Sequence, residues 1–440
     1  MNRRDFLASS TALAASTLFS KTALASDPDV IIVGAGAAGV AAARELISRG
    51  LSVTLLEASS RIGGRVITDH KTFGVPFDVG AHWLHRASHN PFVSYGQQNG
   101  FTLYPAPDEM SLFVGDREAT SAEYRAYGRA YRKTEAAITK AGSRSKDVSA
   151  ASVVPKLGDW QDTVRMAIGP WEMGKDLDHF SCVDWYSGED GKDWFCKEGY
   201  GGLWAHSAQG IPVSLNTPVQ AIDWSGKGVT VETNRGSLKA KACLITVSTG
   251  VLAAEKIRFT PSLPVKKQEA FHGISMGLYN HIALQFSENF FETGDDEYLL
   301  YQLDSHGAKS PRGMGMVTNI SGTNLSTGDV GGGFAAELEA AGEAAALDFG
   351  LSELRKIFGG VVDRSYVKGR YTTWGQNPFT LGSYASAEPG AFKYRKTLRQ
   401  SLGNRLFFAG EAYHKEEWST VTGAHKTGIS VAKKMAKQLA

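Results

Sequence analysis

The chain has 440 residues, of which 42% are hydrophobic and 21% are charged. Its 47 basic and 45 acidic residues leave a formal charge of +2, so no strong field remains to recruit nucleic acid or an anionic membrane. At this length the chain buries a large core, and a prior of about 150 residues per domain predicts two or three domains.

The first 25 residues have the pattern of an export signal. An arginine pair precedes a modestly apolar run, Phe6–Phe19, and the small-residue sequence Ala23-Leu24-Ala25 has the form of a cleavage site. The run is shorter than the ~20 apolar residues that span a bilayer, and it is rich in Ser and Thr. We therefore predict a twin-arginine signal peptide at 1–25 and a periplasmic or exported protein with no stable membrane insertion. An amphipathic first helix is the alternative.

A βαβ unit follows the signal. The β-branched run Val30–Val33 leads directly into a glycine-rich turn, a helix through 41–46 that stops at Gly50, and a second strand at 52–56. In the turn, Gly34 permits a tight bend, Gly36 lets the backbone approach a pyrophosphate, and Gly39 lets helix and strand pack closely. The phosphates would lie at the positive end of the helix.

An acidic residue completes this unit. Glu57 lies 23 residues after Gly34, close to the expected ~20, where a carboxylate binds the ribose hydroxyls. Strand, turn, helix and acid together predict a dinucleotide-binding site. The next segment, SSRIGGR at 59–65, resembles the extension found in the FAD-dependent amine oxidase superfamily. In that family the arginine after the two glycines, here Arg65 beside Gly64, contacts the flavin diphosphate, so the resemblance implies FAD rather than NAD.

The C-terminal region carries a second segment of the same resemblance. RLFFAGE at 405–411, followed by WSTVTGA at 418–424, is similar to the closing FAD segment of the superfamily. The resemblance places Glu411 beside the cofactor and the backbone of Thr420 and Val421 near the flavin pyrimidine.

Three internal segments also match the superfamily. The first resembles the loop beneath the flavin, the second the segment whose valine meets the adenine, and the third the stretch that supplies aromatic side chains to the substrate. Their matching residues are Gly80, Ala81, His82 and Trp83 for the loop, Val219 for the adenine segment, and Trp374 and Tyr384 for the aromatic stretch. The match covers essentially all of the mature chain, and the polyamine oxidase and monoamine oxidase branch is the most similar.

The resemblance implies an α/β fold with two interleaved domains, the amine oxidase fold. A Rossmann-type FAD-binding domain would take 29–90, 199–261 and 393–440, and a substrate-binding domain of mixed sheet and helices would take 91–198 and 262–392. The sequence itself predicts an antiparallel meander from the segments PVSLNTPVQAI, GVTVETN and SLKAKACLITVS. It also predicts a helix at 122–141 and a strand at 281–286.

The implied reaction moves a hydride equivalent from the carbon beside the nitrogen to the flavin, and the resulting imine hydrolyses to an aldehyde or ketone and an amine. An alkylammonium group must first lose its proton, which costs about 4 kcal/mol at pH 7. A desolvating pocket lowers that cost. We assign the pocket lining to Trp374, Tyr384 and Trp418, with Tyr384 orienting the nitrogen lone pair.

Two departures from the family concern the cofactor and the pocket. Ser383 stands where covalent monoamine oxidases have a flavin-linked cysteine, so we expect non-covalent FAD. Thr420 stands where those enzymes have a second cage aromatic, so one wall is open to a longer or bulkier amine.

His281 is a third departure, because the family usually has a lysine that holds a water molecule at this place. Alternation puts Ile282 and Leu284 on one face of the strand and His281 on the other, which by itself favours a solvent-facing histidine. The positional match favours an active-site residue that holds the same water or acts as a base. Because a histidine replaces the lysine, the electron acceptor is left open. It is either oxygen, which would give H2O2, or a periplasmic electron acceptor.

Neither a disulfide framework nor a metal centre is indicated. The count of cysteines is odd, although a bridge between Cys182 and Cys196 is left open. His82, His85 and His89 have the spacing of helical metal ligands, but the segment around them reads as loop and strand, so we predict no metal. His85 is better interpreted as a catalytic-pocket residue.

An acidic cluster and the rival functions remain. The cluster suits the distal charges of a polyamine, although such clusters usually form solvated surface: Asp184, Glu189, Asp190, Asp193 and Glu198. An L-amino-acid oxidase of the same superfamily needs an arginine for the substrate carboxylate, and Arg86 is the local candidate. A desaturase and a non-catalytic flavin-binding partner protein are further alternatives, and a homodimer is left open.

Overall fold

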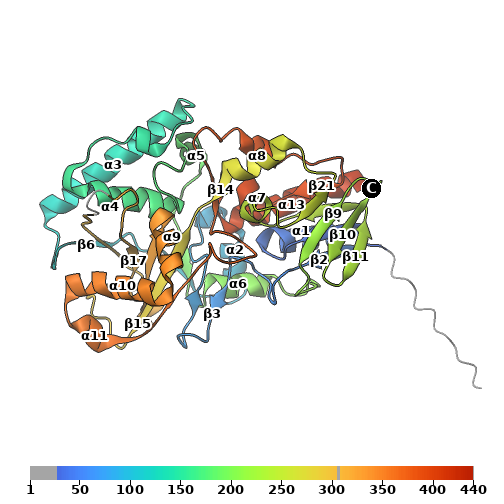
Figure 1. Ribbon diagram of the computed structural model, residues 1–440. Coiled ribbons are helices and arrows are strands. Elements are labelled where there is room, and N and C mark those ends of the chain that lie inside the picture. The colour runs from blue at the N-terminus through green and yellow to red at the C-terminus, as the bar shows by residue number, and fades with distance from the viewer. Residues whose placement is uncertain (1–26, 305–307, 440) are drawn as a thin grey trace, which may run out of the picture.

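The computed structural model describes residues 27–304 and 308–439, so the predicted signal peptide lies outside the described residues. Two halves lie side by side (Figure 1). One is built around a parallel sheet and the other around a larger mixed sheet. The predicted α/β class is confirmed.

The parallel sheet draws its strands from distant parts of the chain. Its order is β2 (Val53–Leu56), β1 (Val30–Val33), β12 (Ala242–Ile245) and β21 (Leu406–Phe408). On one face, Val30 and Ile32 pack against α1 (Ala37–Ser48) and α13 (Val421–Leu439). On the other, Ile31 and Val33 pack against a second, smaller sheet. Because both faces are covered, these strands are short continuous apolar runs. The predicted βαβ unit is confirmed.

The smaller sheet corrects one strand prediction. Its order is β11 (Gly236–Ala240), β10 (Val229–Thr233), β9 (Val219–Asp223) and β13 (Arg258–Thr260), in which β9 to β11 form the predicted antiparallel meander. The third predicted segment, 237–248, is not one strand. It divides after Ala240, and β12 enters the parallel sheet between β1 and β21. The physical reason is its continuous apolar run, which suits a strand buried on both faces.

A seven-stranded mixed sheet forms the centre of the other half of the described chain. Its order is β19 (Tyr366–Tyr371), β15 (Tyr279–Phe286), β18 (Leu325–Gly331), β17 (Gly315–Val317), β16 (Tyr298–Tyr301), β6 (Met110–Val114) and β7 (Arg117–Glu118). The predicted helix at 122–141 is α3 (Ser121–Ser143), which begins with a capping box between Thr120 and Glu123. Helices α4 (Gln161–Met166), α9 (Gly332–Ala341) and α10 (Glu343–Phe358) pack on the same core.

The remaining elements connect these layers. The short strand pairs are β3 (Thr68–Asp69) with β4 (Phe77–Asp78), β5 (Leu103–Pro105) with β8 (Trp194–Cys196), and β14 (Ile274–Met276) with β20 (Ala385–Ala387). The other helices are α2 (Pro91–Gln98), α5 (Cys182–Ser187), α6 (Tyr200–Ser207), α7 (Thr249–Ala253), α8 (Val265–Gly273), α11 (Val361–Ser365) and α12 (Tyr394–Leu398).

His281 is buried, so the solvent-facing interpretation from alternation is wrong. Only 3% of this residue is exposed. Ile282 on one face of β15 packs into the helical core, as predicted. The opposite face is also covered, because Phe73 and Phe77 from the β3–β4 region pack against Ala283. Alternation along β15 predicted one buried and one exposed face. The second face is in fact buried, because the segment around β3 and β4 covers it.

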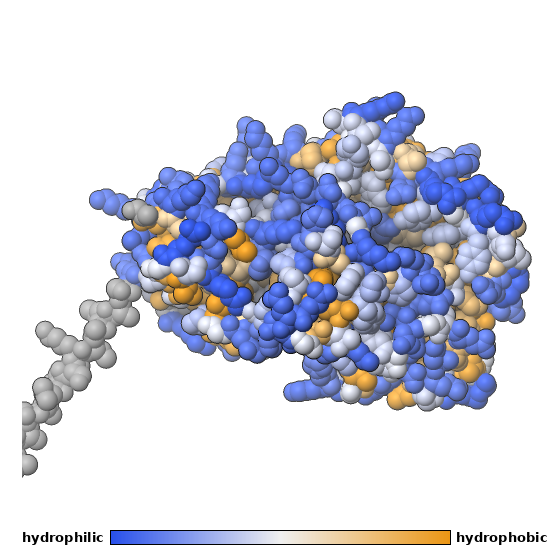
Figure 2. Space-filling view, turned by 180° about the vertical axis from the view of Figure 1, so that it is seen from behind, coloured by the Kyte–Doolittle hydropathy of each residue, from blue (hydrophilic) through white to orange (hydrophobic). Residues whose placement is uncertain are grey.

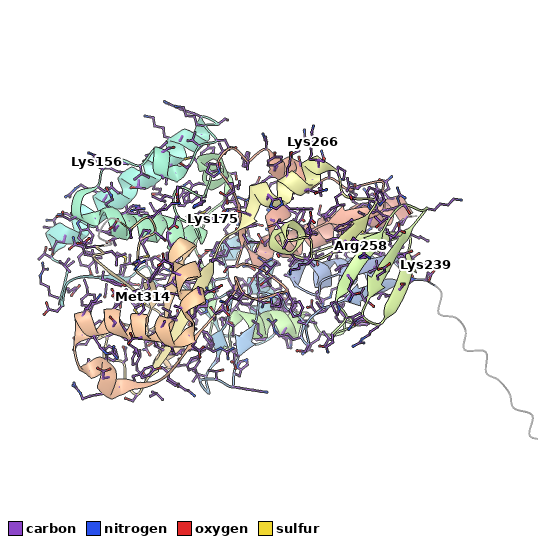
Figure 3. The ribbon with its side chains drawn as sticks, in the orientation of Figure 1. Lys156, Lys175, Lys239, Arg258, Lys266 and Met314 are labelled. Carbon is purple, nitrogen blue, oxygen red and sulfur yellow. The ribbon has the colours of Figure 1, made fainter. Side chains whose placement is uncertain are left out.

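The surface is polar over the face seen in Figure 2, where apolar residues form only small groups. Among the described residues, no helix combines the length and the apolar character needed to cross a membrane. Figure 3 shows Lys239 and Arg258 on the small sheet at one end, whereas the fully buried Met314 lies in the other half. The thiols of Cys182 and Cys196 are buried and free, so the bridge left open between them is not formed.

Candidate active site

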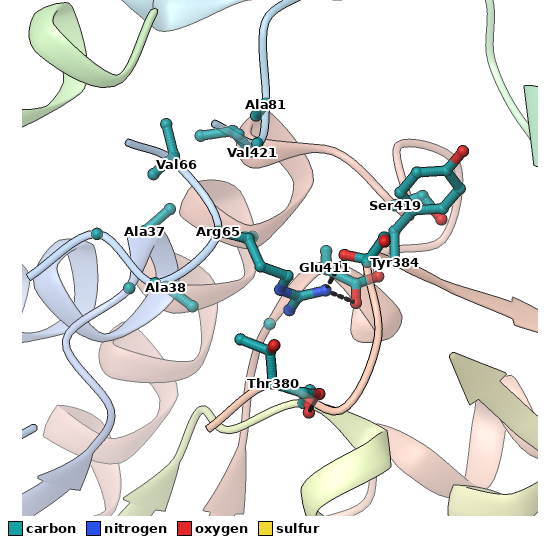
Figure 4. Close-up of a pocket in the computed structure, with 18 of the residues that line it drawn as sticks. Ala37, Ala38, Arg65, Val66, Ala81, Thr380, Tyr384, Glu411, Ser419 and Val421 are labelled. Carbon is teal, nitrogen blue, oxygen red and sulfur yellow. Dashed lines mark hydrogen bonds and ion pairs between the residues drawn. The ribbon is translucent and has the colours of Figure 1, made fainter. Parts of the chain in front are cut away.

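A cavity of about 840 Å³ is lined by residues from both halves of the molecule. Figure 4 shows Ala37 and Ala38 on one side of it and Tyr384 on the other, with Arg65 and Glu411 between them. All but one of the predicted site residues line this cavity: Gly34, Gly36, Glu57, Gly64, Arg65, Gly80, Ala81, His82, Trp83, His85, Val219, His281, Trp374, Tyr384, Glu411, Thr420 and Val421. The exception is Gly39. The roles assigned to these residues stay predictions.

The glycine turn leaves room for a ligand on its cavity side. Gly34 has a φ of +103°, which favours glycine, and a Cβ on Gly39 would lie 1.9 Å from the carbonyl oxygen of Gly34. Gly39 therefore serves the close packing of α1 on β1. A Cβ on Gly36, by contrast, would meet only the Gly63 oxygen, at 3.9 Å. This turn fits a dinucleotide pyrophosphate.

Glu57 is fixed at the start of this cradle. One carboxylate oxygen accepts a hydrogen bond from the Ala35 amide at 2.8 Å, and the other accepts from the amide and hydroxyl of Ser59 at 2.9 and 2.8 Å. The Thr217 amide bonds the carbonyl of Glu57 at 2.8 Å, which brings the segment before Val219 to the same place. The oxygen bonded to the Ala35 amide keeps a second lone pair for a ribose hydroxyl.

Arg65 joins three segments in the middle of the cavity (Figure 4). Its Nη1 donates to the Ser383 carbonyl at 2.7 Å and to the Glu411 carboxylate at 2.9 Å. Thr420 caps the last helix, because its hydroxyl accepts from the Gly423 amide at 2.9 Å. The N-terminal end of α13, with Val421, therefore opens onto the cavity.

The loop predicted to lie beneath the flavin is held tightly. A Cβ on Gly80 would lie 2.1 Å from the Arg65 carbonyl oxygen and 2.9 Å from the Trp374 ring. The His82 Nδ1 lies 2.9 Å from the Asp78 carboxylate, which also accepts from the Tyr200 amide at 3.0 Å. No hydrogen-bond partner within the described residues reaches the buried Nε2 of His82.

His281 forms a buried pair that the sequence argument missed. Its Nδ1 lies 2.6 Å from the Asp329 carboxylate and its Nε2 lies 3.1 Å from the Gly80 carbonyl oxygen. Asp329 is fully buried and also accepts a hydrogen bond from the Tyr279 hydroxyl at 2.8 Å. Residues 281 and 329 are directly opposed in the antiparallel pair β15–β18. The sequence signal that could have revealed this pair is Asp329 itself, an acidic residue within the buried strand β18.

Aromatic side chains line one end of the cavity, which we call the aromatic end: Trp83, Trp171, Tyr279, Tyr298, Tyr384 and Trp418. The rings of Tyr279 and Tyr384 have centroids 5.9 Å apart, and those of Trp83 and Tyr279 lie 6.4 Å apart. The Trp83 indole donates to the Tyr298 hydroxyl at 3.2 Å. Trp171, Tyr279 and Tyr298 were not predicted, because no local motif marks them.

Trp374 and Trp418 are anchored by hydrogen bonds as well as by packing. The Trp374 indole donates to the Val79 carbonyl at 3.1 Å. The Trp418 indole donates to the Ser187 hydroxyl at 3.3 Å, and its ring lies 4.7 Å from the Arg395 guanidinium. Both residues line the cavity, and their hydrogen bonds fix the positions of their rings.

The acidic cluster divides in the structure. Three predicted members line the cavity at the aromatic end, Glu189, Asp190 and Asp193, together with Glu172 and Glu417, which were not predicted. The other two predicted members do not: Asp184 forms a buried ion pair with Arg395, and Glu198 accepts from the Thr102 amide. For these two the predicted polyamine contact is not supported, because their charges are used within the protein.

Glu172 was missed by the sequence argument, and its environment is unusual. Glu172 is exposed because it lines the open cavity, and the protein around that cavity reduces its hydration. Burial, together with the charges of Asp190 and Glu135, raises the pKa of Glu172 to about 7, against the hydrogen bond from Tyr131. The Tyr384 hydroxyl donates to the Glu172 carbonyl at 3.2 Å, which ties this acid to the aromatic end.

His85 and Arg86 are each paired with acids at the same end. The His85 Nδ1 lies 2.9 Å from Asp193. Burial lowers the pKa of His85, but the nearby Asp193 carboxylate outweighs it and the pKa is raised. Arg86 bonds Glu417 at 2.9 Å and lies 3.4 Å from Glu189.

The three histidines of the 82–89 segment do not converge. His82 bonds Asp78, His85 bonds Asp193, and the His89 ring contacts the neighbouring Ser88 hydroxyl. Across residues 27–304 and 308–439, no group of three or more His, Cys, Asp or Glu side chains is arranged to hold a metal ion.

Comparisons with known proteins agree with this geometry. Residues 37–436 match the family model described as flavin containing amine oxidoreductase. The chain is 30% identical over 451 residues to polyamine oxidase 4 of Oryza sativa subsp. japonica. The aligned region covers 94% of this chain and 90% of that protein.

Two solved structures have the same fold. Wild-type putrescine oxidase bound to putrescine gives a TM-score of 0.77 at 20% identity, over 93% of this chain and 99% of that one. Cyclohexylamine oxidase from Brevibacterium oxydans IH-35A gives a TM-score of 0.76 at 23% identity, over 94% of this chain and 99% of that one. These likenesses confirm the predicted amine oxidase fold. The chain therefore belongs to the flavin-containing amine oxidoreductases, enzymes that oxidise amines with FAD.

Proposed function

We propose that this protein oxidises a diamine or polyamine by hydride transfer to non-covalent FAD, giving an imine that hydrolyses. The observation that carries the proposal is the charge at the aromatic end of the cavity. Glu172 and Asp190 stand there beside aromatic walls, which suits a substrate with one amine to react and a further ammonium to bind. A bulky primary or secondary amine is the second candidate, because Thr420 leaves one wall without an aromatic ring.

The chain's own residues would prepare the amine. FAD supplies the hydride acceptor when bound, held by the glycine turn, Glu57 and the start of α13. The rings of Trp83, Tyr279 and Tyr384 exclude water, and this desolvation favours the neutral amine that must form before oxidation. Deprotonation costs about 4 kcal/mol for an ordinary alkylammonium group at pH 7, so even partial desolvation is worth a large factor in rate.

The contacts of Ser383 support non-covalent attachment of FAD. Its hydroxyl accepts from the Tyr279 amide and donates to the Tyr279 carbonyl, both at 2.8 Å, so it is engaged with the backbone. Acid precipitation should therefore release yellow FAD into the supernatant. Colour retained in the protein pellet would contradict this part of the proposal.

An L-amino-acid oxidase is less well supported, because the guanidinium of Arg86 already pairs with Glu417 and Glu189. A free arginine would be needed to bind a substrate carboxylate. A desaturase is less well supported for a related reason, since a carotenoid-like hydrocarbon has no use for the carboxylates at the aromatic end.

The test is anaerobic bleaching of the flavin by spermidine, putrescine, an aromatic monoamine and L-amino acids in turn. We expect the fastest reduction with spermidine or putrescine. Fastest reduction by the monoamine would favour the second candidate, and reduction by amino acids alone would overturn the proposal. If no amine bleaches the flavin, the protein is a flavin-binding partner without turnover. Admitting oxygen afterwards, with detection of H2O2, identifies the electron acceptor.

We further propose export through the twin-arginine route, with oxygen or a periplasmic redox protein as electron acceptor. The support is the sequence pattern at 1–25 alone. Replacing Arg3 and Arg4 by lysine should retain the protein with the unprocessed N-terminus in the cytoplasm. Unchanged processing of that variant would contradict this route.

A further inference from the structure

The two ring nitrogens of His281 both face hydrogen-bond acceptors. On one side Nε2 lies 3.1 Å from the Gly80 carbonyl oxygen, which accepts hydrogen bonds and cannot donate. On the other side Nδ1 lies 2.6 Å from the Asp329 carboxylate. A lone pair on Nε2 would point at the Gly80 oxygen, so Nε2 carries a proton.

The second proton lies between Nδ1 and Asp329. Imidazole is ordinarily more basic than a carboxylate by between two and three pKa units, roughly 6.5 against 3.9, so the shared proton belongs to the ring. The other oxygen of Asp329 faces donors, since Tyr279 donates to it at 2.8 Å and the Trp171 indole at 3.4 Å. Such donors stabilise a carboxylate rather than a carboxylic acid.

The charged groups around His281 favour a protonated ring. Burial lowers the pKa of His281, but the Asp329 carboxylate outweighs it, assisted by the Gly80 carbonyl and by Asp78 from β4, and the pKa is raised. The ring neighbours are Tyr279, with centroids 5.6 Å apart, and Phe77, at 6.3 Å. Neither brings a positive charge.

We propose that Asp329 is a positioning residue that keeps His281 doubly protonated, so that the imidazolium ring holds the Gly80 carbonyl and the loop of Gly80 to Trp83 in place. His281 then donates hydrogen bonds at the family's lysine position and has no lone pair with which to act as a base. The protonation state rests on the protein's own contacts. Only its bearing on catalysis rests on the proposed amine oxidation.

The test is a nuclear magnetic resonance titration of the holoprotein labelled with ¹⁵N-histidine. The signals that vanish in His281→Gln identify His281. We expect both nitrogens of His281 to carry protons at pH 7. In Asp329→Asn the pKa of His281 should fall, because the compensating charge is lost while burial remains.

A matched control is Asp193→Asn, which removes the same kind of partner from Nδ1 of His85. It should shift the titration of His85 and leave that of His281 unchanged. An unprotonated nitrogen on His281 in the wild type at pH 7 would overturn the proposal, and this measurement stands even if Asp329→Asn does not fold. Unchanged titration in a folded Asp329→Asn would also overturn it. Amine turnover enters neither readout, so a failure here is distinct from a failure of the proposed function.

A second readout follows the loop. His281→Lys keeps a cation that can donate to both acceptors, whereas His281→Gln does not. We expect the FAD dissociation constant, measured by fluorescence on reconstitution, to be closer to the wild type in the lysine variant than in the glutamine variant. The reverse order would contradict the role of a fixed cation.

Discussion

We expect Glu172 to make the binding of a cationic substrate depend on pH. Its pKa of about 7 leaves the side chain neutral below that pH and negative above it. A positively charged amine should therefore bind more tightly as the pH rises from about 6 to 8, by roughly fivefold, the upper range for an ion pair reached by solvent. In Glu172→Gln this component should be absent. The measurement is KM for putrescine across this pH range.

The control for Glu172 is Glu198→Gln, which removes a glutamate of the predicted acidic cluster that does not line the cavity. Its pH profile should match the wild type. If Glu172→Gln keeps the full rise in affinity, another group carries the dependence and the assignment to Glu172 is wrong.

At the level of single residues, the sequence identified the cavity residues that belong to local motifs better than those at the aromatic end. Gly36, Glu57 and Arg65 belong to local patterns, so short stretches of sequence are enough to find them. Tyr279 and Asp329 meet only because β15 and β18 pair in one register. That register is set by contacts far apart in the chain, which no local spacing encodes.

The turn between β1 and α1 offers a test that separates binding from folding. In Gly36→Ala the new methyl group meets only the Gly63 oxygen, at 3.9 Å, and the φ of −81° suits alanine, so the apoprotein should fold normally. The methyl group would enter the space assigned to the pyrophosphate. The FAD dissociation constant should rise by roughly tenfold, equal to about 1.4 kcal/mol.

Gly39→Ala is the matched variant in the same turn. Its methyl group would lie 1.9 Å from the Gly34 oxygen, so α1 must move away from β1. We expect the free energy of unfolding to fall by about 1–3 kcal/mol, the usual cost of overpacking. Denaturant unfolding of both apoproteins checks the pair, and equal stability of the two variants would contradict the argument.

Elements were predicted well where their signals are local and less well where they depend on partners. The strand, turn and helix of residues 30–48 were found because apolar run, glycine and helix formers follow one another directly. The division of 237–248 into β11 and β12 was missed because the two parts pair with strands of different sheets. β11 pairs with β10, and β12 pairs with β1. The same holds for the cover over His281, which comes from Phe73 and Phe77.

A buried ion pair ties α5 to the C-terminal part of the chain. Arg395 donates to the two oxygens of Asp184 at 2.5 and 2.7 Å and to the Ala412 carbonyl at 2.9 Å. Arg395→Met leaves the Asp184 charge buried without its partner, so the free energy of unfolding should fall by about 3–5 kcal/mol. The Trp418 ring, which stacks on Arg395, should lose its fixed position and change its fluorescence.

Arg355→Met tests the same substitution at the exposed pair with Asp363, which has a similar two-pronged geometry. Its denaturation midpoint should stay near that of the wild type, because solvent replaces the lost partner. Replacing both Arg395 and Asp184 by neutral residues should cost less than the sum of the single changes. Equal effects at the buried and exposed pairs would contradict this account.

The order of strands in the parallel sheet has a consequence for synthesis on the ribosome. β1 is made long before β21 and α13, which complete its sheet and cover α1. A nascent chain therefore carries an unfinished sheet edge until β21 and α13 have been synthesised. We expect cofactor uptake to wait until Val421–Leu439 has been synthesised, because a shorter nascent chain lacks the helix whose N-terminal end opens onto the cavity.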